Sequence, residues 1–203
     1  MNRASFRNVI SAYYESPATR LLAFLRITPN ALTAIGLITA IGSGYVISQG
    51  YLAIGGVGIV IAGAFDMLDG SLARSINKTT LFGAFLDSTA DRFSEIVILL
   101  GILMYFQNNS YPTGVILVYL TLSSSIMVSY VRARAESIGI IEKTGLMTRP
   151  ERVIILALGL ILSHWWENGI LVALVTIFVL GSFTVIQRVL VVWKHLSKQN
   201  SSK

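Results

Sequence analysis

The chain has 203 residues, of which 54% are hydrophobic and only 13% are charged. This composition excludes an ordinary soluble domain and predicts an all-α integral membrane protein that forms a single domain over residues 1–203. The absence of cysteine excludes disulfides and thiolate metal sites. The net charge of +6 could suit a nucleic acid, but the basic residues are distributed as membrane topology requires, so no nucleic acid partner is expected.

The first 27 residues carry an apolar stripe with helical spacing that begins at Phe6, and the arginines lie off this stripe. The pattern predicts an interfacial amphipathic helix on the membrane surface, in a juxtamembrane segment over residues 1–27. The alternative is an ordinary cytoplasmic helix packed on the rest of the protein, which Pro17 would bend or interrupt. At the other end of the chain, residues 194–203 are expected to form a polar, frayed tail.

Between these ends, six apolar segments are each predicted to cross the membrane as a helix. They cover residues 31–48, 52–68, 85–106, 113–131, 153–166 and 170–190. All 16 lysines and arginines fall on one side of this six-span arrangement, and the three turns on the other side contain none. By the positive-inside rule, we expect a multi-pass protein of the cell membrane with both termini and the acidic cluster described below in the cytoplasm.

The first span begins at a clear helix start signal. Thr28 is predicted to cap the helix, and Pro29 suits its first position, where a missing N–H costs nothing. The first two spans are also rich in glycine, which indicates close packing between helices.

Four of the ten acidic residues lie where the second span ends and the third begins, namely Asp66, Asp69, Asp87 and Asp91. Their spacing places each pair on one face of its helix, and a turn near residues 75–80 brings both pairs to the same depth. Such a cluster repels itself unless a cation holds it together. Carboxylate oxygens suit Mg²⁺, Mn²⁺ or Ca²⁺, whereas the two histidines are too far away in sequence to favour zinc.

Two residues beside this cluster suit a phosphate. Gly70 lets another group approach the backbone closely, and Arg74 supplies a fixed positive charge. The alternative is that these polar residues only hold packed helices together.

The stretch fits the pattern D-x2-D-G-x2-A-R-x8-G-x3-D-x3-D at every specified position, from Asp66 to Asp91. It resembles the signature of the CDP-alcohol phosphotransferases, and the resemblance extends over nearly the whole chain. It implies two Mg²⁺ ions, with Mn²⁺ as a substitute, held by Asp66, Asp69, Asp87 and Asp91. Asp91 would also be the general base, and a homodimer is implied. The implied CDP-lipid site consists of Pro29, Asn30, Ala31, Leu32, Gly70, Arg74 and Thr80.

Basic residues gather after the fourth span and before the fifth. Residues 148–151 have the form of a capping box and predict a helix that runs into the fifth span. Arg152 lies in the first turn, where a cation opposes the helix dipole, which favours a role in binding an anion. Contact with lipid head groups is the alternative for Arg132, Arg134, Arg149 and Arg152.

Three segments resemble the phosphatidylinositol-phosphate synthase branch of this family. They are residues 83–95, residues 129–139 with 149–152, and the pair Gln187 and Arg188. The resemblance implies transfer of a phosphatidyl group from CDP-diacylglycerol to an inositol phosphate, with release of CMP, by a protein surrounded by membrane lipids. Arg132, Arg152 and Arg188 would bind the acceptor phosphate, although the branch usually has lysine where Arg132 stands.

Two other functions remain open. The branch that uses glycerol 3-phosphate to make phosphatidylglycerophosphate also needs a basic pocket, but its typical K-x-K-T-x-x-Q segment is absent. A membrane transporter could use intramembrane carboxylates, but here they cluster at one edge, and the spans show no internal repeat.

Overall fold

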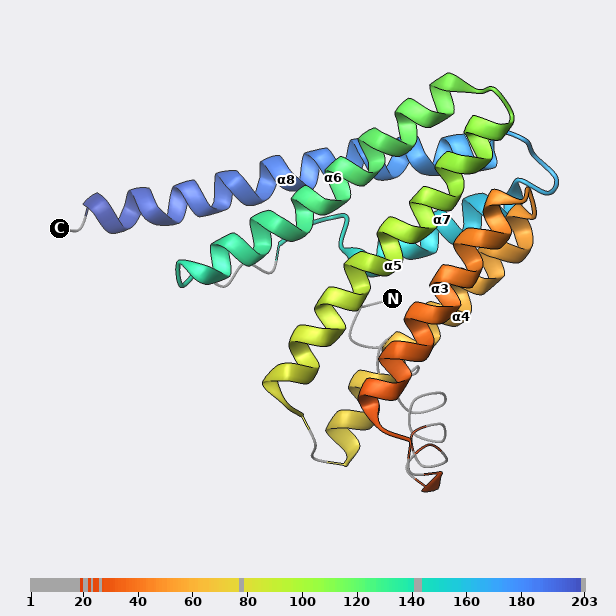
Figure 1. Ribbon diagram of the computed structural model, residues 1–203. Helices are drawn as coiled ribbons and strands as arrows, with labels where there is room; N and C mark the ends of the chain where they lie inside the picture. The colour runs from red at the N-terminus through yellow and green to blue at the C-terminus, as the bar shows by residue number, and fades with distance from the viewer. Residues whose placement is uncertain are drawn as a thin grey trace.

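The computed structural model describes residues 19, 22, 24, 25, 27–76, 79–140 and 144–201, with side chains as far as Ser197 (Figure 1). No strand occurs in these residues, so the prediction of an all-α protein is confirmed for them. The interfacial helix predicted within residues 1–27 lies largely outside the described residues. The helices are α3 (Pro29–Ser48), α4 (Leu52–Ser75), α5 (Leu81–Asn108), α6 (Pro112–Ser137), α7 (Arg149–Leu162) and α8 (Gly169–Ser201).

Four of these helices, α3, α4, α6 and α8, are long and apolar enough to cross a membrane. Spanning length and composition are therefore shown for four of the six predicted spans. Helix α7 has 14 residues and a length of about 21 Å, which is less than the roughly 30 Å of a hydrocarbon core. Helix α5 is long enough with 28 residues, but Asp87, Asp91, Arg92 and Glu95 interrupt its apolar sequence.

The predicted helix start signals are present, with one difference. Thr28 caps α3 by accepting a hydrogen bond from the backbone N–H of Ala31, and Pro29 occupies the first turn, as predicted. Thr148 precedes α7 as the predicted capping box requires, but its hydroxyl donates to the Glu151 carboxylate and does not cap a backbone N–H. The start of α7 was therefore predicted correctly and its capping contact was not.

The end of α8 also differs from the expectation. The polar tail predicted to fray at residues 194–203 is helical as far as Ser201. No glycine or proline follows Gly181, so the sequence contains no local signal that would end the helix earlier.

The six helices pack as a closed ring, because α3 contacts α4 and α5, α5 contacts α6, α6 contacts α8, and α7 joins α8 to α4. Each helix runs in the direction opposite to the helix that precedes it in the chain. In Figure 1, α6 and α8 diverge from α3, α4 and α5 toward one end of the molecule, which we call the open end. The N-termini of α3, α5 and α7 and the C-termini of α4, α6 and α8 lie there. All four aspartates of the sequence motif belong to this end.

The opposite, closed end is held together by contacts between backbones. A Cβ added at Gly101 of α5 would overlap the carbonyl of Gly44 of α3, and one added at Gly44 would lie 2.7 Å from the Val97 oxygen. Apolar side chains such as Leu99 and Ile102 fill the adjacent core. Small residues thus allow α3 and α5 to touch, as the glycine-rich sequence suggested.

Candidate active site

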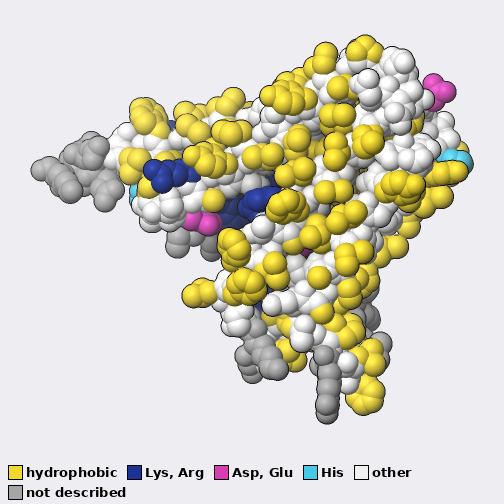
Figure 2. Space-filling view, viewed as in Figure 1, with side chains coloured by type: hydrophobic (Ala, Val, Ile, Leu, Met, Phe, Trp, Pro, Cys, Tyr) yellow, Lys and Arg dark blue, Asp and Glu magenta, His cyan; other side chains and the backbone are white. Residues whose placement is uncertain are grey.

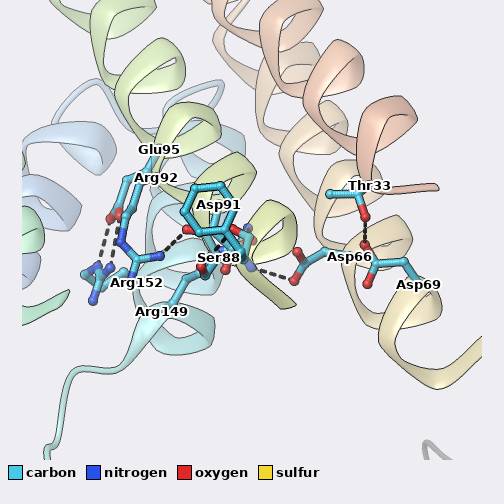
Figure 3. Close-up of polar contacts among 10 residues, drawn as sticks. Thr33, Asp66, Asp69, Ser88, Asp91, Arg92, Glu95, Arg149 and Arg152 are labelled. Carbon is cyan, nitrogen blue, oxygen red and sulfur yellow. Dashed lines mark hydrogen bonds and ion pairs between the residues drawn. The ribbon is translucent and has the colours of Figure 1, made fainter. Parts of the chain in front are cut away.

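Three carboxylates from two helices converge at the open end (Figure 3). Asp66 and Asp69 come from α4 and Asp87 from α5, and each offers an oxygen within 4.8 Å of the others. Among the described residues, these are the acidic or histidine side chains close enough together to hold one metal ion. Oxygen ligands of this kind suit Mg²⁺ or Mn²⁺, so the donor set fits the ions that the sequence implied.

Thr33 of α3 completes this cluster, although its side chain was not among the predicted site residues. Its hydroxyl donates to Asp69 Oδ2 at 2.5 Å, and both side chains are buried. The Thr33 position, four residues after Pro29, places this hydroxyl at the start of α3. A buried carboxylate needs such a partner, so Thr33 fixes which way one oxygen of Asp69 points.

The predicted CDP-lipid residues also lie at the open end, but not all of their side chains are exposed. Asn30 is exposed and comes close to Gly83, whereas Leu32 is 1% exposed and packs against Leu68 and Leu72. The Leu32 side chain therefore supports the helix start from within the core. Pro29 and Ala31 are half-buried beside it.

The remaining predicted CDP-lipid residues are on α4 and before α5. Arg74 folds back over the backbone of Gly70, because a Cβ added there would lie 3.3 Å from Arg74 Nη1. Thr80 caps α5 by accepting from the Gly83 N–H at 2.9 Å. Its hydroxyl thus has a structural role that the sequence motif did not reveal.

Asp91 lies beside the three-carboxylate cluster and shares an arginine with it. Arg149 of α7 reaches Asp66 Oδ2 through Nη1 at 2.5 Å and Asp91 Oδ1 through Nη2 at 2.7 Å. One guanidinium therefore joins a residue of α4 to the expected base on α5 (Figure 3). Sequence analysis named Arg149 only among basic residues near the fifth span, because no local pattern distinguishes it from Arg152.

The three predicted acceptor arginines lie around one polar pocket, each with partners of its own. Arg152 is 3% exposed and makes two hydrogen bonds to Glu95, Nε to Oε1 at 2.8 Å and Nη2 to Oε2 at 2.9 Å. Arg132 lies at the exposed rim and pairs with Glu136 at 2.9 Å. The sequence did not identify either glutamate, although Glu95 lies four residues after Asp91 and hence on the same helix face.

Arg188 is held differently, by backbone oxygens. It is 3% exposed and donates to the carbonyls of Val128 at 2.7 Å and Thr144 at 3.0 Å. These bonds tie α8 to α6 and to the segment that leads toward α7. Arg188 thus combines a structural role with its position beside the pocket.

The polar pocket has a volume of about 340 Å³ and contains Asp91 together with Arg132, Arg152 and Arg188 in its lining. Figure 2 shows basic side chains gathered in a recess of a face that is otherwise largely hydrophobic. A hydroxyl compound that carries a phosphate could place its phosphate among the arginines and its hydroxyl near Asp91.

A second, larger cavity of about 660 Å³ lies inside the helix ring and is lined mainly by apolar side chains. Four charged residues line both spaces, namely Asp91, Glu95, Arg149 and Arg152. We call this group the charged wall. Two carboxylates of α5 thus face two arginines of α7, and these ion pairs separate the polar pocket from the apolar cavity.

The sequence is similar to those of known proteins over most of its length. The family model described as CDP-alcohol phosphatidyltransferase matches residues 26–193. An archaetidylinositol phosphate synthase of Methanothermobacter thermautotrophicus is 37% identical, with 94% of each chain covered. A phosphatidylinositol phosphate synthase of Mycobacterium bovis is 32% identical, with 95% of this chain and 89% of that one covered.

Solved structures give the same result. The phosphatidylinositol phosphate synthase of Mycobacterium tuberculosis with CDP-DAG bound superposes with a TM-score of 0.81 at 32% identity, covering 89% of this chain and 94% of that one. The same enzyme in complex with manganese and citrate gives a TM-score of 0.82 at 32% identity, with 88% of each chain covered. The sequence match, the helix arrangement and the placement of the aspartates lead to one conclusion: this chain belongs to the CDP-alcohol phosphatidyltransferase family.

Proposed function

We propose that the protein transfers the phosphatidyl group of CDP-diacylglycerol to a hydroxyl of an inositol phosphate, giving phosphatidylinositol phosphate and CMP. The observation that carries this proposal is the pocket in which Asp91 lies beside Arg132, Arg152 and Arg188. A base next to several arginines suits an acceptor that is both a hydroxyl compound and a phosphate. Relatives named as inositol phosphate synthases, similar over most of the chain, support the choice of acceptor.

In the proposed reaction, the acceptor oxygen forms a bond to the lipid phosphorus while the bond from that phosphorus to CMP breaks. Asp91 accepts the proton of the acceptor hydroxyl. Asp66, Asp69 and Asp87 would hold a divalent cation, with Asp91 as a further ligand if two ions bind. A cation there would offset the pyrophosphate charge and stabilise the departing CMP.

The residues at the start of α3 and the end of α4 would receive the donor. Arg74 supplies a positive charge directly over Gly70, where no side chain stands between the guanidinium and the backbone, so this pair would bind the pyrophosphate. The backbone at Pro29, Asn30, Ala31 and Leu32 and the region of Thr80 would line the nucleotide site. Thr33 would keep Asp69 oriented toward the cation.

The acceptor phosphate would bind among the arginines without their leaving their present partners. Glu95 occupies Nε and Nη2 of Arg152, and the Met147 carbonyl accepts from Nη1 at 3.4 Å, but each terminal nitrogen of a guanidinium carries two hydrogens. The free hydrogens can donate to a phosphate while the glutamate holds the guanidinium plane. Arg132 at the rim and Arg188 inside would contribute charge from two further helices.

The membrane arrangement is also part of the proposal. We infer that α5 and α7 cross the membrane as members of the ring together with α3, α4, α6 and α8, because Asp91, Glu95 and Arg152 line the two spaces that the ring encloses. The positive-inside distribution supports a cytoplasmic open end with both termini on that side. A homodimer through the exposed apolar helix faces is expected from the family.

The test measures CMP release by the purified protein in detergent or lipid nanodiscs with CDP-diacylglycerol as donor. Inositol phosphate should support much faster release than glycerol 3-phosphate, serine or free inositol, and chelation of divalent ions should stop it until Mg²⁺ or Mn²⁺ is restored. A preference for glycerol 3-phosphate would overturn the acceptor but not the reaction class. Flux of inositol or cations into proteoliposomes without CMP release would instead indicate a transporter.

A further inference from the structure

Arg149 occupies a place that the proposed reaction leaves unexplained. Its guanidinium contacts Asp66 Oδ2 at 2.5 Å and Asp91 Oδ1 at 2.7 Å, using a different nitrogen for each. The residue thus bonds to one carboxylate expected to bind a cation and to the carboxylate expected to act as the base (Figure 3). A metal ion bound to Asp66 or Asp91 through either of these oxygens would therefore compete with Arg149.

The contacts of the neighbouring arginine indicate why Arg149 differs. Arg152 is held by Glu95, which lies outside the three-carboxylate cluster, so a cation bound by Asp66, Asp69 and Asp87 leaves that pair intact. Both ion-pair partners of Arg149 belong to the proposed reaction centre itself. A guanidinium keeps its charge at any pH that a protein tolerates, so it cannot leave these oxygens by losing a proton.

We propose that Arg149 is an internal counter-cation that competes with divalent metal ions for Asp66 and Asp91. In the absence of metal it neutralises the two carboxylates and keeps the base engaged; a divalent ion displaces it and thereby frees Asp91. This inference rests on the metal-dependent reaction proposed above, and it adds a residue whose position couples metal binding to the availability of the base.

The surroundings provide a place for the displaced side chain. Arg149 is part of the charged wall and lines the polar pocket with Arg132, Arg152 and Arg188. Its side chain is also the most exposed of the four in the charged wall, at 27%, compared with 3% for that of Arg152. A guanidinium released from the carboxylates therefore remains beside the pocket proposed for the anionic acceptor.

The test measures Mn²⁺ binding directly, from the electron paramagnetic resonance signal of free Mn²⁺ during titration of the full-length protein in detergent without substrates. Wild type is compared with Arg149→Gln and with Arg134→Gln, a matched control. Arg134 is exposed on α6 and lies outside both cavities. Loss of a competing charge at contact distance should lower the apparent Kd of Mn²⁺ roughly tenfold in Arg149→Gln and leave it unchanged in the control.

Arg149→Lys provides a second variant that keeps the charge, should the glutamine variant not fold. A single ammonium cannot reproduce two contacts through separate nitrogens, so its Kd should fall between those of wild type and Arg149→Gln. Mn²⁺ affinity that is unchanged or weaker in both variants overturns the competition. Absence of Mn²⁺ binding in every variant would instead overturn the proposed metal chemistry, and the competition with it.

Discussion

The two halves of α5 have opposite properties although they belong to one continuous helix. Its first half lies at the open end and carries Asp87, Asp91 and Glu95 beside two cavities. Its second half lies at the closed end, where Gly101 meets the backbone of Gly44 and one apolar face, which includes Leu99 and Ile102, is buried. The charged half contacts its neighbours through ion pairs, and the apolar half contacts them through backbone and hydrocarbon.

This difference shows how one helix can combine a rigid support with a space for reactants. Contact between backbones at the closed end leaves no gap between α3 and α5. At the open end α6 and α8 diverge from α3, α4 and α5 (Figure 1), and the long side chains of Arg149 and Arg152 reach from α7 to α5. The closed end thus fixes the positions of helices whose open ends must hold the aspartates in register. Substitutions at the two ends should therefore affect different quantities.

The largest effect should come from the open half of α5, with Asp91→Asn. Asparagine keeps the shape but cannot accept the proton of the acceptor hydroxyl, and a general base contributes about 10²- to 10⁴-fold in rate. We expect kcat for CMP release to fall by about that factor while CDP-diacylglycerol still binds. Steady-state kinetics and a lipid-binding assay measure the two quantities; unchanged turnover would remove Asp91 from the chemistry.

Glu95→Gln should change both the stability of the protein and the binding of the acceptor, because it breaks an ion pair that joins α5 to α7 beside the polar pocket. The substitution leaves Arg152, which is 3% exposed, without its charged partner. Removing one member of a buried ion pair costs about 3–5 kcal/mol, and the 14% exposure of Glu95 places this case near the lower figure. We expect a lower unfolding temperature in detergent together with a raised KM for inositol phosphate.

Glu136→Gln is the matched control for that experiment. Glu136 pairs with Arg132 at the exposed rim, where an ion pair contributes about 0–1 kcal/mol. Its unfolding temperature should match that of wild type. If Glu136→Gln lowered the unfolding temperature as much as Glu95→Gln does, the burial of the Glu95–Arg152 pair would not explain its contribution to stability.

Gly101→Ala should break the closed end without touching the site. The added methyl group would overlap the Gly44 carbonyl, so α3 and α5 must separate, at a cost of about 1–3 kcal/mol. The control is Gly42→Ala on α3, where an added Cβ meets nothing within 4 Å. Thermal unfolding followed by size-exclusion chromatography compares the two, and equal stability would disprove the proposed support by backbone contact.

The smallest effect should come from Arg132→Gln. Arg132 is exposed, and its pair with Glu136 stabilises the fold little, so unfolding should not change. Loss of one charge at the pocket rim should raise KM for inositol phosphate a few-fold and leave kcat nearly unchanged, since water screens the rim. An effect on kcat larger than on KM would place Arg132 in the chemistry instead of in acceptor binding.

Much of this arrangement could be predicted from local sequence. The helix starts after Thr28 and Thr148 and the spacing of the aspartates depend on neighbours within a few residues, so the sequence revealed both helix starts and the convergence of Asp66, Asp69 and Asp87. Periodicity also located the helices α3 to α8. Among the described residues, four of these helices are long and apolar enough to cross a membrane.

The partners of the arginines could not be predicted in the same way. Arg152 pairs with Glu95, Arg188 binds backbone carbonyls, and Arg149 joins Asp66 to Asp91, all across more than 40 positions in sequence. Such contacts depend on how α7 and α8 dock on the ring, which the periodicity of one helix does not determine. The sequence therefore showed which charges are present near the pocket but not which of them neutralise one another.

The charged wall also bears on how reactants of opposite solubility could meet. It adjoins a polar pocket on one side and an apolar cavity on the other, and both spaces share Asp91, Glu95, Arg149 and Arg152. A sugar phosphate partitions into water and a diacyl lipid into the bilayer, so in free solution their encounter requires one of them to enter an unfavourable solvent. Where two such compartments share a boundary one side chain thick, each reactant can stay in its own phase until the bond forms. The rate of such an enzyme would then depend on the surface density of the donor in the membrane and on the bulk concentration of the acceptor, two quantities that can be varied independently.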